Sequence, residues 1–105
     1  MNIGNAIKQV RTHYELSQME LSSRTGISQT SISQIESGAK NPSKRSVKAI
    51  CDAFEIPEAI LYVLGMEDLD VPATRKRVYQ ELYPAMKDFA IQLIGKRKSR
   101  ILKDK

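Results

Sequence analysis

The sequence predicts an all-α fold, with five short helices followed by a C-terminal helical extension of one or two helices. Apolar residues recur at intervals of three and four along most of the chain, and no segment shows the sustained alternation typical of a strand. Serine, proline and glycine also occur where helices are expected to start and stop. The 105 residues, 41% of them hydrophobic and 28% charged, suit one small folded domain with an appended element.

The first two helices are predicted from an apolar face and a pair of end signals. One helix is expected from about Ile3 to His13, with its apolar residues on one side. Ser17 and Glu20 have the spacing of a capping box, so a second helix should begin there. Gly26 is expected to end it, because glycine readily adopts a positive φ.

The third helix is predicted to lie between Ser28, a suitable N-cap, and Gly38. Ile27 and Ile32 stand at the positions of a hydrophobic staple, which would fix the angle at which the chain enters the helix. The opening of this helix is therefore well specified, even though its polar residues are weak helix formers.

The fourth and fifth helices carry clear apolar faces. The fourth should follow Ser43, and its inner face consists of Val47, Ile50, Cys51 and Phe54. The fifth should start at Pro57 and stop at Gly65, with Ile60, Leu61 and Leu64 directed inward. Cys51 is interpreted as a small core residue rather than a redox sensor. Because one cysteine and one histidine cannot supply a metal ligand set, no metal or other cofactor is expected.

Four segments follow from this reading. They are a domain at 1–65, an acidic linker at 66–71, the helical extension at 72–98 and a basic tail at 99–105. Pro72 and Pro84 suit first turns, which predicts separate helices at about 72–82 and 84–98. A row of apolar residues runs along this extension: Val78, Leu82, Met86, Phe89 and Leu93.

The net charge of +5 is unevenly distributed. Residues 1–65 carry seven basic and six acidic side chains, whereas residues 95–105 carry six basic and one acidic. The overall charge therefore says little about the folded part. No apolar run approaches the roughly 18 residues of a membrane span, and no signal peptide is evident. With a single cysteine, the sequence predicts a reducing, cytoplasmic setting and no membrane partner.

The outward face of the third helix is unusual for a merely solvated surface. Projection at about 100° per residue, with Ile32 and Ile35 inward, places Thr30, Ser33 and Gln34 outside. Gln29 projects from the first turn, and Glu36 lies near the core. Such hydroxyl and amide groups can read base edges in a major groove. The alternative interpretation is an ordinary capped surface helix.

The segment "LSQMELSSRTGISQTSISQIESGAKNPS" closely resembles the helix-turn-helix of the Cro/lambda-repressor (Xre-type) family. The matching features are Gln18, Leu21, Gly26 and the run "SxxSISQIESG", and the likeness extends from about Ile3 to Leu64. The resemblance implies a five-helix lambda-repressor-like domain whose third helix enters the major groove of double-stranded DNA. That docking geometry is the one described for phage repressors and Cro.

The resemblance also implies roles for individual residues. The base-reading candidates are Gln29, Thr30, Ser33 and Gln34. The backbone candidates are Gln18, Arg24, Ser28, Lys40, Asn41, Ser43, Lys44 and Arg45. In family members with glutamines at the positions of Gln18 and Gln29, the two side chains brace each other. The family pattern further pairs a helix arginine, here Arg11, with the glutamate before the closing glycine, here Glu36.

Two residues depart from the family pattern. Ser22 stands where alanine is usual, so its hydroxyl needs a partner. Glu55 stands where glycine usually ends the fourth helix, and a left-handed conformation there would cost roughly 1 kcal/mol or more.

The resemblance predicts a transcription regulator, most simply a repressor that binds an inverted repeat as a homodimer. An enzyme is not expected, since no serine has a nucleophile motif. The apolar row on the extension is the expected dimer interface, although the extension could instead fold back onto the fifth helix. One alternative is an antitoxin-like module whose extension binds a partner protein. A third, an RNA-binding adaptor, is disfavoured because aromatic stacking sets are lacking.

Overall fold

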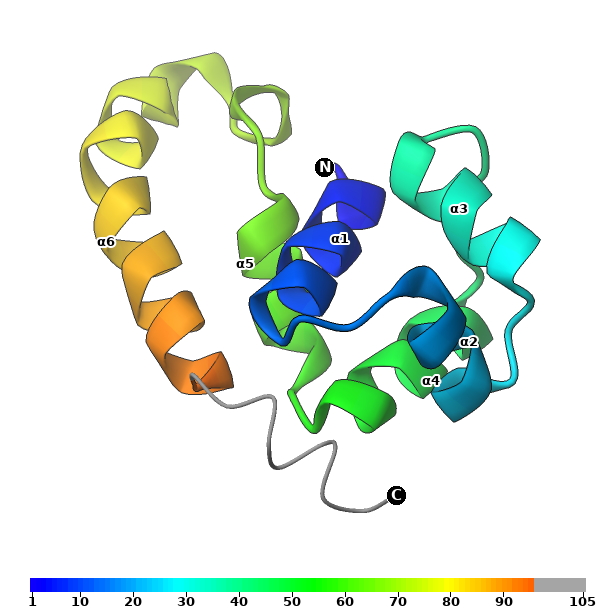
Figure 1. The fold of residues 1–105 in the computed structure, drawn as a ribbon. Helices are drawn as coiled ribbons and strands as arrows, with labels where there is room; N and C mark the ends of the chain where they lie inside the picture. The colour runs from blue at the N-terminus through cyan, green and yellow to red at the C-terminus, as the bar shows by residue number, and fades with distance from the viewer. Residues whose placement is uncertain (96–105) are drawn as a thin grey trace.

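The computed structural model describes residues 1–95, in which the regular secondary structure is all helical with no strand, and this confirms the predicted all-α class (Figure 1). The helices are α1 (Ile3–His13), α2 (Gln18–Thr25), α3 (Gln29–Ser37), α4 (Lys44–Phe54), α5 (Glu58–Gly65) and α6 (Lys76–Ile94), with short 3-10 turns η1 (Asp68–Asp70) and η2 (Ala73–Arg75) before α6. The basic tail and the end of the predicted extension lie outside the described residues.

The predicted ends of α2 and α3 are confirmed. The Ser17 hydroxyl accepts from the Glu20 amide at 3.0 Å, and the Glu20 carboxylate accepts from the Ser17 amide at 2.8 Å, which completes the capping box. Ser28 caps α3 by accepting from the Ser31 amide at 3.1 Å. Gly26 and Gly38 end the two helices with φ of 78° and 86°, where other residues would be strained.

Helix α4 ends in the strained manner that the sequence suggested. Glu55 has φ 60° and ψ 42°, the left-handed conformation that glycine provides elsewhere in the family. The four predicted inner residues of α4 are buried. Burial raises the pKa of the Cys51 thiol to about 11, with smaller contributions from the charges of Glu58 and Asp52, so this side chain is an uncharged part of the core.

Helix α5 ends at Gly65, as the sequence predicted. This glycine is buried, and it is not among the glycines with positive φ. The Asn2 amide donates to its carbonyl at 2.7 Å, and a Cβ at this position would lie 3.0 Å from the Asn2 carbonyl oxygen. A side chain at this position would crowd the Asn2 backbone, so glycine favours close approach of the chain here rather than a turn. Pro57 precedes α5 as its N-cap residue and is not within its first turn.

Helix α1 is the central element, since it contacts α3 and α5 (Figure 1). Ala6, Ile7 and Val10 are completely buried there. Gly4 brings α1 especially close to α3, because a Cβ at Gly4 would lie only 2.0 Å from the carbonyl oxygen of Ile35. The position of α3 therefore depends directly on α1.

The extension differs from the predicted pair of helices. A single helix, α6, runs through Pro84, and the expected 66–71 linker and the start of the first expected helix form η1 and η2 instead. Proline removes one backbone hydrogen bond, at a cost of about 3 kcal/mol in a helix interior. Packing offsets this loss, since the Tyr83 hydroxyl donates to the Val63 carbonyl at 2.7 Å on one side of the proline and Ala90 and Ile94 are buried on the other.

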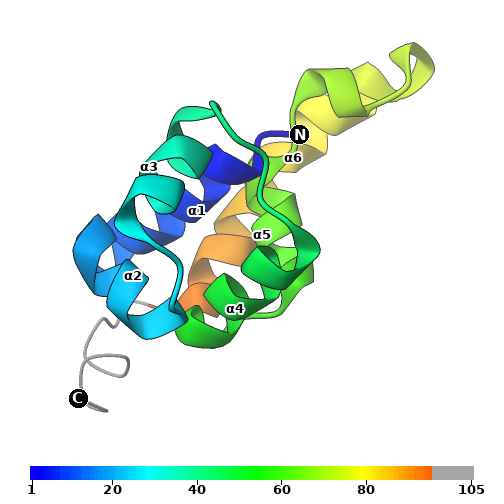
Figure 2. The same ribbon diagram turned by 90° about the vertical axis from the view of Figure 1, so that its right-hand side faces the viewer.

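Helix α6 folds back onto the domain, and its row of apolar residues nevertheless stays exposed. Helix α6 packs against α5, yet Val78, Leu82, Met86, Phe89 and Leu93 are between 42% and 63% exposed. In Figure 2 the first turns of α6, with η1 and η2, extend beyond the five-helix domain. Within residues 1–95, no helix is long and apolar enough to cross a membrane.

We expect Gly4→Ala to lower the free energy of unfolding by about 2 kcal/mol or more, because the new methyl group meets a backbone oxygen that cannot move without shifting α3. Gly38→Ala is a suitable control. It adds a methyl group in open space at φ 86°, and should cost about 1 kcal/mol. Urea unfolding of both variants measures the difference, and an equal loss would show that the α1–α3 contact tolerates a side chain.

Candidate nucleic-acid interface

The four base-reading candidates occupy one exposed surface of α3, which we call the α3 polar face. It consists of Gln29, Thr30, Ser33 and Gln34, all of them exposed. Together with Gln18 at the start of α2, they line a shallow hollow where α2 and α3 meet. No side-chain hydrogen bond within residues 1–95 occupies these four residues. Their amide and hydroxyl groups are therefore available to a ligand.

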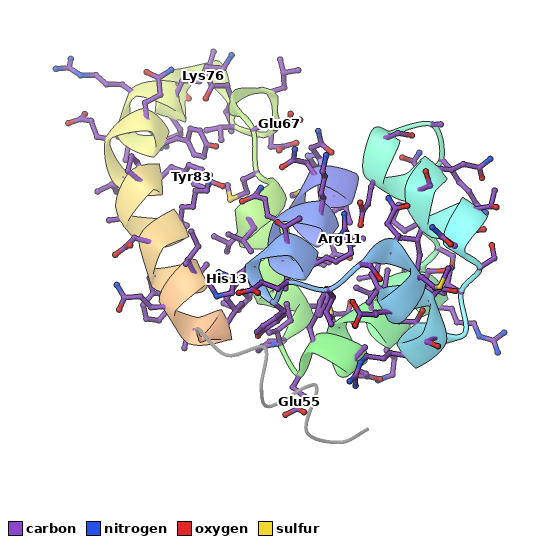
Figure 3. The ribbon with its side chains drawn as sticks, in the orientation of Figure 1. Arg11, His13, Glu55, Glu67, Lys76 and Tyr83 are labelled. Atoms are coloured by element: carbon purple, nitrogen blue, oxygen red, sulfur yellow. The ribbon has the colours of Figure 1, made fainter. Side chains whose placement is uncertain are left out.

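Behind this face, Arg11 and Glu36 form a shielded ion pair. Arg11 Nε donates to Glu36 Oε2 at 2.7 Å, and Arg11 Nη2 donates to Oε1 at 2.9 Å, so the contact is bidentate. Figure 3 shows Arg11 on the side of α1 that faces α3. The two side chains are only 11% and 4% exposed. Arg11 Nη1 also donates to the Leu16 carbonyl at 2.7 Å, which ties the segment between α1 and α2 to the same guanidinium.

Gln18 extends this network. Its Nε2 donates to Glu36 Oε1 at 3.1 Å, so the start of α2 is joined to the end of α3. The family resemblance implied that Gln18 would contact Gln29. Among the described residues, the hydrogen-bond partner of the Gln18 side chain is instead Glu36. Gln29 consequently projects from α3 without a side-chain partner there.

Ser22 has the partner that its hydroxyl requires. Its Oγ donates to the Ile27 carbonyl at 2.5 Å, inside the turn between α2 and α3. The Ile27 amide in turn donates to Thr25 Oγ1 at 3.2 Å. A serine in place of alanine therefore stabilises the turn rather than disturbing it.

The loop after α3 contacts that helix through Lys40. The Lys40 amide donates to the Gln34 carbonyl at 3.1 Å, and Lys40 Nζ donates to Ser31 Oγ at 3.2 Å, so the loop folds back over α3. Ser43 caps α4 by accepting from the Ser46 amide at 3.1 Å. The other predicted backbone contacts after α3, Asn41, Lys44 and Arg45, are exposed.

Arg24 is placed differently from the other predicted backbone contacts. Its Nε and Nη2 atoms are shielded from solvent and have no hydrogen-bond partner within residues 1–95. Two of its donor atoms therefore do not face the solvent, which makes it the weakest of the predicted phosphate contacts.

Sequence reasoning missed three residues that position α3 or α6: Gly4, His13 and Tyr14. Gly4 lies three residues before the buried Ile7, and this shared helical face was the available signal. His13 Nε2 lies beside the Gly95 carbonyl. The Tyr14 hydroxyl donates to the Ile94 carbonyl. Nothing local in the sequence predicts these two contacts across about 80 residues.

Residues 1–95 contain no group of three or more His, Cys, Asp or Glu side chains able to hold a metal ion. The α3 polar face itself has no ionisable group. What the arrangement supplies is a set of neutral, exposed hydrogen-bonding groups on one helix, with Lys40 bonded to Ser31 of the same helix.

A family model described as helix-turn-helix matches residues 7–61, which is more than half of the chain and reaches from α1 into α5. The chain therefore belongs to this Cro/C1-type helix-turn-helix family of DNA-binding transcription regulators. A search of curated proteins finds no match.

We expect Arg11→Ala to lower the free energy of unfolding by about 3 kcal/mol, because it leaves the Glu36 carboxylate shielded without its main partner. The double variant Arg11→Leu, Glu36→Leu should recover part of this loss, since neither charge then remains unpaired. Chemical denaturation of the single and double variants provides the comparison. A single-variant loss below about 1 kcal/mol would mean that the pair does not hold α3 in place.

Proposed function

We propose that this protein is a sequence-specific repressor of transcription that binds an inverted repeat in double-stranded DNA as a homodimer, with α3 in the major groove. The observation that carries the proposal is the α3 polar face, which is exposed and uncharged and makes no side-chain hydrogen bond within the described residues 1–95. Family membership supports DNA as the ligand. A dimeric repressor covers two half-sites and so can exclude other proteins from the same segment.

The chemistry of the α3 polar face suits base edges. A glutamine amide can bond an adenine bidentately, so Gln29 and Gln34 are the proposed main readers. Thr30 offers a methyl group for thymine, and Ser33 offers a hydroxyl that can donate or accept. Serine and threonine lower helix propensity relative to lysine or glutamate. Their presence on this face is explained by recognition and not by helix stability.

Phosphate contacts are assigned to the flanking groups. Lys40, Lys44 and Arg45 supply the charges, while Asn41, Ser43, Ser28 and Gln18 supply neutral donors beside them, with Arg24 as a minor contributor. If about three cations per subunit neutralise phosphates, a dimer makes about six such contacts. The logarithm of affinity should then fall with the logarithm of salt concentration with a slope of about −5.

The α6 apolar row, defined as Val78, Leu82, Met86, Phe89 and Leu93, is the proposed dimer interface. It lies about 100° around the helix from the face containing Tyr83, Ala90 and Ile94, and it is roughly 22 Å long at 1.5 Å per residue. A monomer rarely exposes so long an apolar row. A second copy is the proposed occupant, because a two-fold axis buries the same patch on both subunits at once.

The same row also supports a second candidate function. An antitoxin-like protein could cover its α6 apolar row with a partner protein and bind DNA only to regulate its own expression. Stable co-purification with a second small protein that occupies the row would favour that function. We argue the homodimer because a helix-turn-helix domain needs a second half-site contact to bind tightly.

Selection of bound sites from random duplex DNA should yield an inverted repeat, and Gln29→Ala or Gln34→Ala should weaken binding to it by about 1–3 kcal/mol while relaxing one base position. Lys44→Ala is the matched control. It should weaken all sequences alike and make the salt slope less negative by about one. Unchanged sequence preference in both glutamine variants would remove α3 as the reading element.

The dimer is tested by introducing charge into the α6 apolar row. Leu82→Lys with Phe89→Lys should convert the dimer to a monomer in analytical ultracentrifugation, because two lysines on each subunit would be brought into contact across the axis. Asp88→Lys, which adds positive charge on a neighbouring position outside the row, serves as the control. A dimer that persists in the double variant would exclude this surface as the interface.

A further inference from the structure

We infer that α6 is fixed rigidly to the DNA-reading domain, so that the dimer recognises one spacing between its two half-sites and discriminates against spacings that differ by a single base pair. The inference rests on the proposed function, since it requires a dimer that binds paired half-sites. It adds to that function a structural determinant of operator choice that contacts no base.

The C-terminal end of α6 is held by the end of α1. The last carbonyl groups of a helix have no partner within the helix. Here the Tyr14 hydroxyl donates to the Ile94 carbonyl, and His13 Nε2 lies beside the Gly95 carbonyl. Figure 3 shows His13 at the end of α1, near the last turn of α6. Tyr14 is only 3% exposed, and its ring packs against Phe54 with a centroid distance of 5.7 Å. The group that holds α6 is therefore itself part of the core.

A second attachment lies nearer the N-terminal end of α6. The Tyr83 hydroxyl donates to the Val63 carbonyl of α5 at 2.7 Å, and the rings of Tyr79 and Tyr83 stack with centroids 4.9 Å apart. Tyr83 and Ile94 are separated by about 16 Å along the helix. Two attachment points at this separation fix both the direction of α6 and its rotation about its own axis.

The segment that leads into α6 is also structured. The Val71 amide donates to the Asp68 carbonyl at 3.2 Å within η1, and Gln80 Nε2 of α6 donates to Asp68 Oδ2 at 3.3 Å. The α-amino group of Met1 contacts Asp70 Oδ1 at 2.6 Å and Glu67 Oε1 at 3.0 Å. A flexible linker would let two DNA-binding domains adjust their separation, but residues 66–75 do not have that character.

Helix α1 connects the reading helix and the dimer helix. It holds α3 through Arg11 and the close approach at Gly4, and it holds α6 through His13 and Tyr14. The α3 polar face and the α6 apolar row thus belong to one rigid frame. When two such frames pair through α6, the distance and the angle between their α3 helices are set by the protein.

Because DNA is helical, a rigid dimer should bind best to one length of spacer between its two half-sites. Each added base pair moves one half-site by about 3.4 Å and rotates it by roughly 35° about the helix axis. A rigid dimer can follow that change only by twisting or bending the duplex, and such deformation lowers affinity. We therefore expect a change of one base pair in the spacer to weaken binding at least tenfold.

The test uses the full-length protein and duplexes that share one selected pair of half-sites but differ in spacer length by −1, 0, +1 and +2 base pairs. Wild-type protein should bind one spacing at least tenfold more tightly than its neighbours. His13→Ala combined with Tyr14→Phe should reduce this preference to threefold or less, while binding to a single half-site stays within twofold of wild type. Tyr62→Phe, which removes an exposed α5 hydroxyl with no hydrogen bond within residues 1–95, is the matched control and should retain the full preference.

A second variant and a folding check distinguish loss of the α6 attachment from unfolding of the chain. Tyr83→Phe removes the other attachment, and circular dichroism together with half-site binding verifies that each variant remains folded. Wild-type affinities that agree within twofold across all spacings would overturn the inference and leave the proposed function intact. Full spacing preference in both loosened variants would overturn it as well. A monomer that selects single half-sites would overturn both the inference and the proposed dimeric function.

Discussion

The ion pair between Arg11 and Glu36 is the interaction on which the reading surface depends. It joins the last turn of α1 to the end of α3, and Gln18 and the Leu16 carbonyl complete its hydrogen bonds. Because Glu36 is used in this way, the charged residue of α3 is turned inward and the outward face remains neutral. The same contact therefore fixes the position of α3 and determines the chemistry that α3 presents.

Recognition and stability make opposite demands on α3. The helix has nine residues and little intrinsic propensity, so it would be marginal in isolation. Its stability comes from elsewhere: Ser28 and Gly38 define its ends, while Ile32 and Ile35 bury its inner side. With these contacts in place, the outer side is free to carry serine, threonine and glutamine. Helix α6 shows a similar division, with one side packed on the domain and the apolar row left exposed.

Local signals predicted the domain well, and long-range contacts limited the prediction for the extension. Ser17, Glu20 and Gly26 specify their conformations within a few residues, so the ends of α2 could be read directly. Pro84 also carries a local signal, but packing on both sides of it overrides that signal and keeps α6 continuous. Whether α6 folds back or exposes its apolar row could not be decided from spacing, since it does both. The site residues could be grouped by helical projection and family resemblance, whereas the partner of Gln18 required the spatial arrangement of α2 and α3.

The central claim, that the α3 polar face reads DNA, is tested most directly by mapping backbone amide shifts by NMR as a selected duplex is added. The account predicts that the largest changes fall on residues 29–34, with smaller changes at the start of α2 and in the loop around Lys40, and that a scrambled duplex reproduces only the changes expected from phosphate contact. Changes confined to α6, or identical changes with both duplexes at residues 29–34, would contradict it.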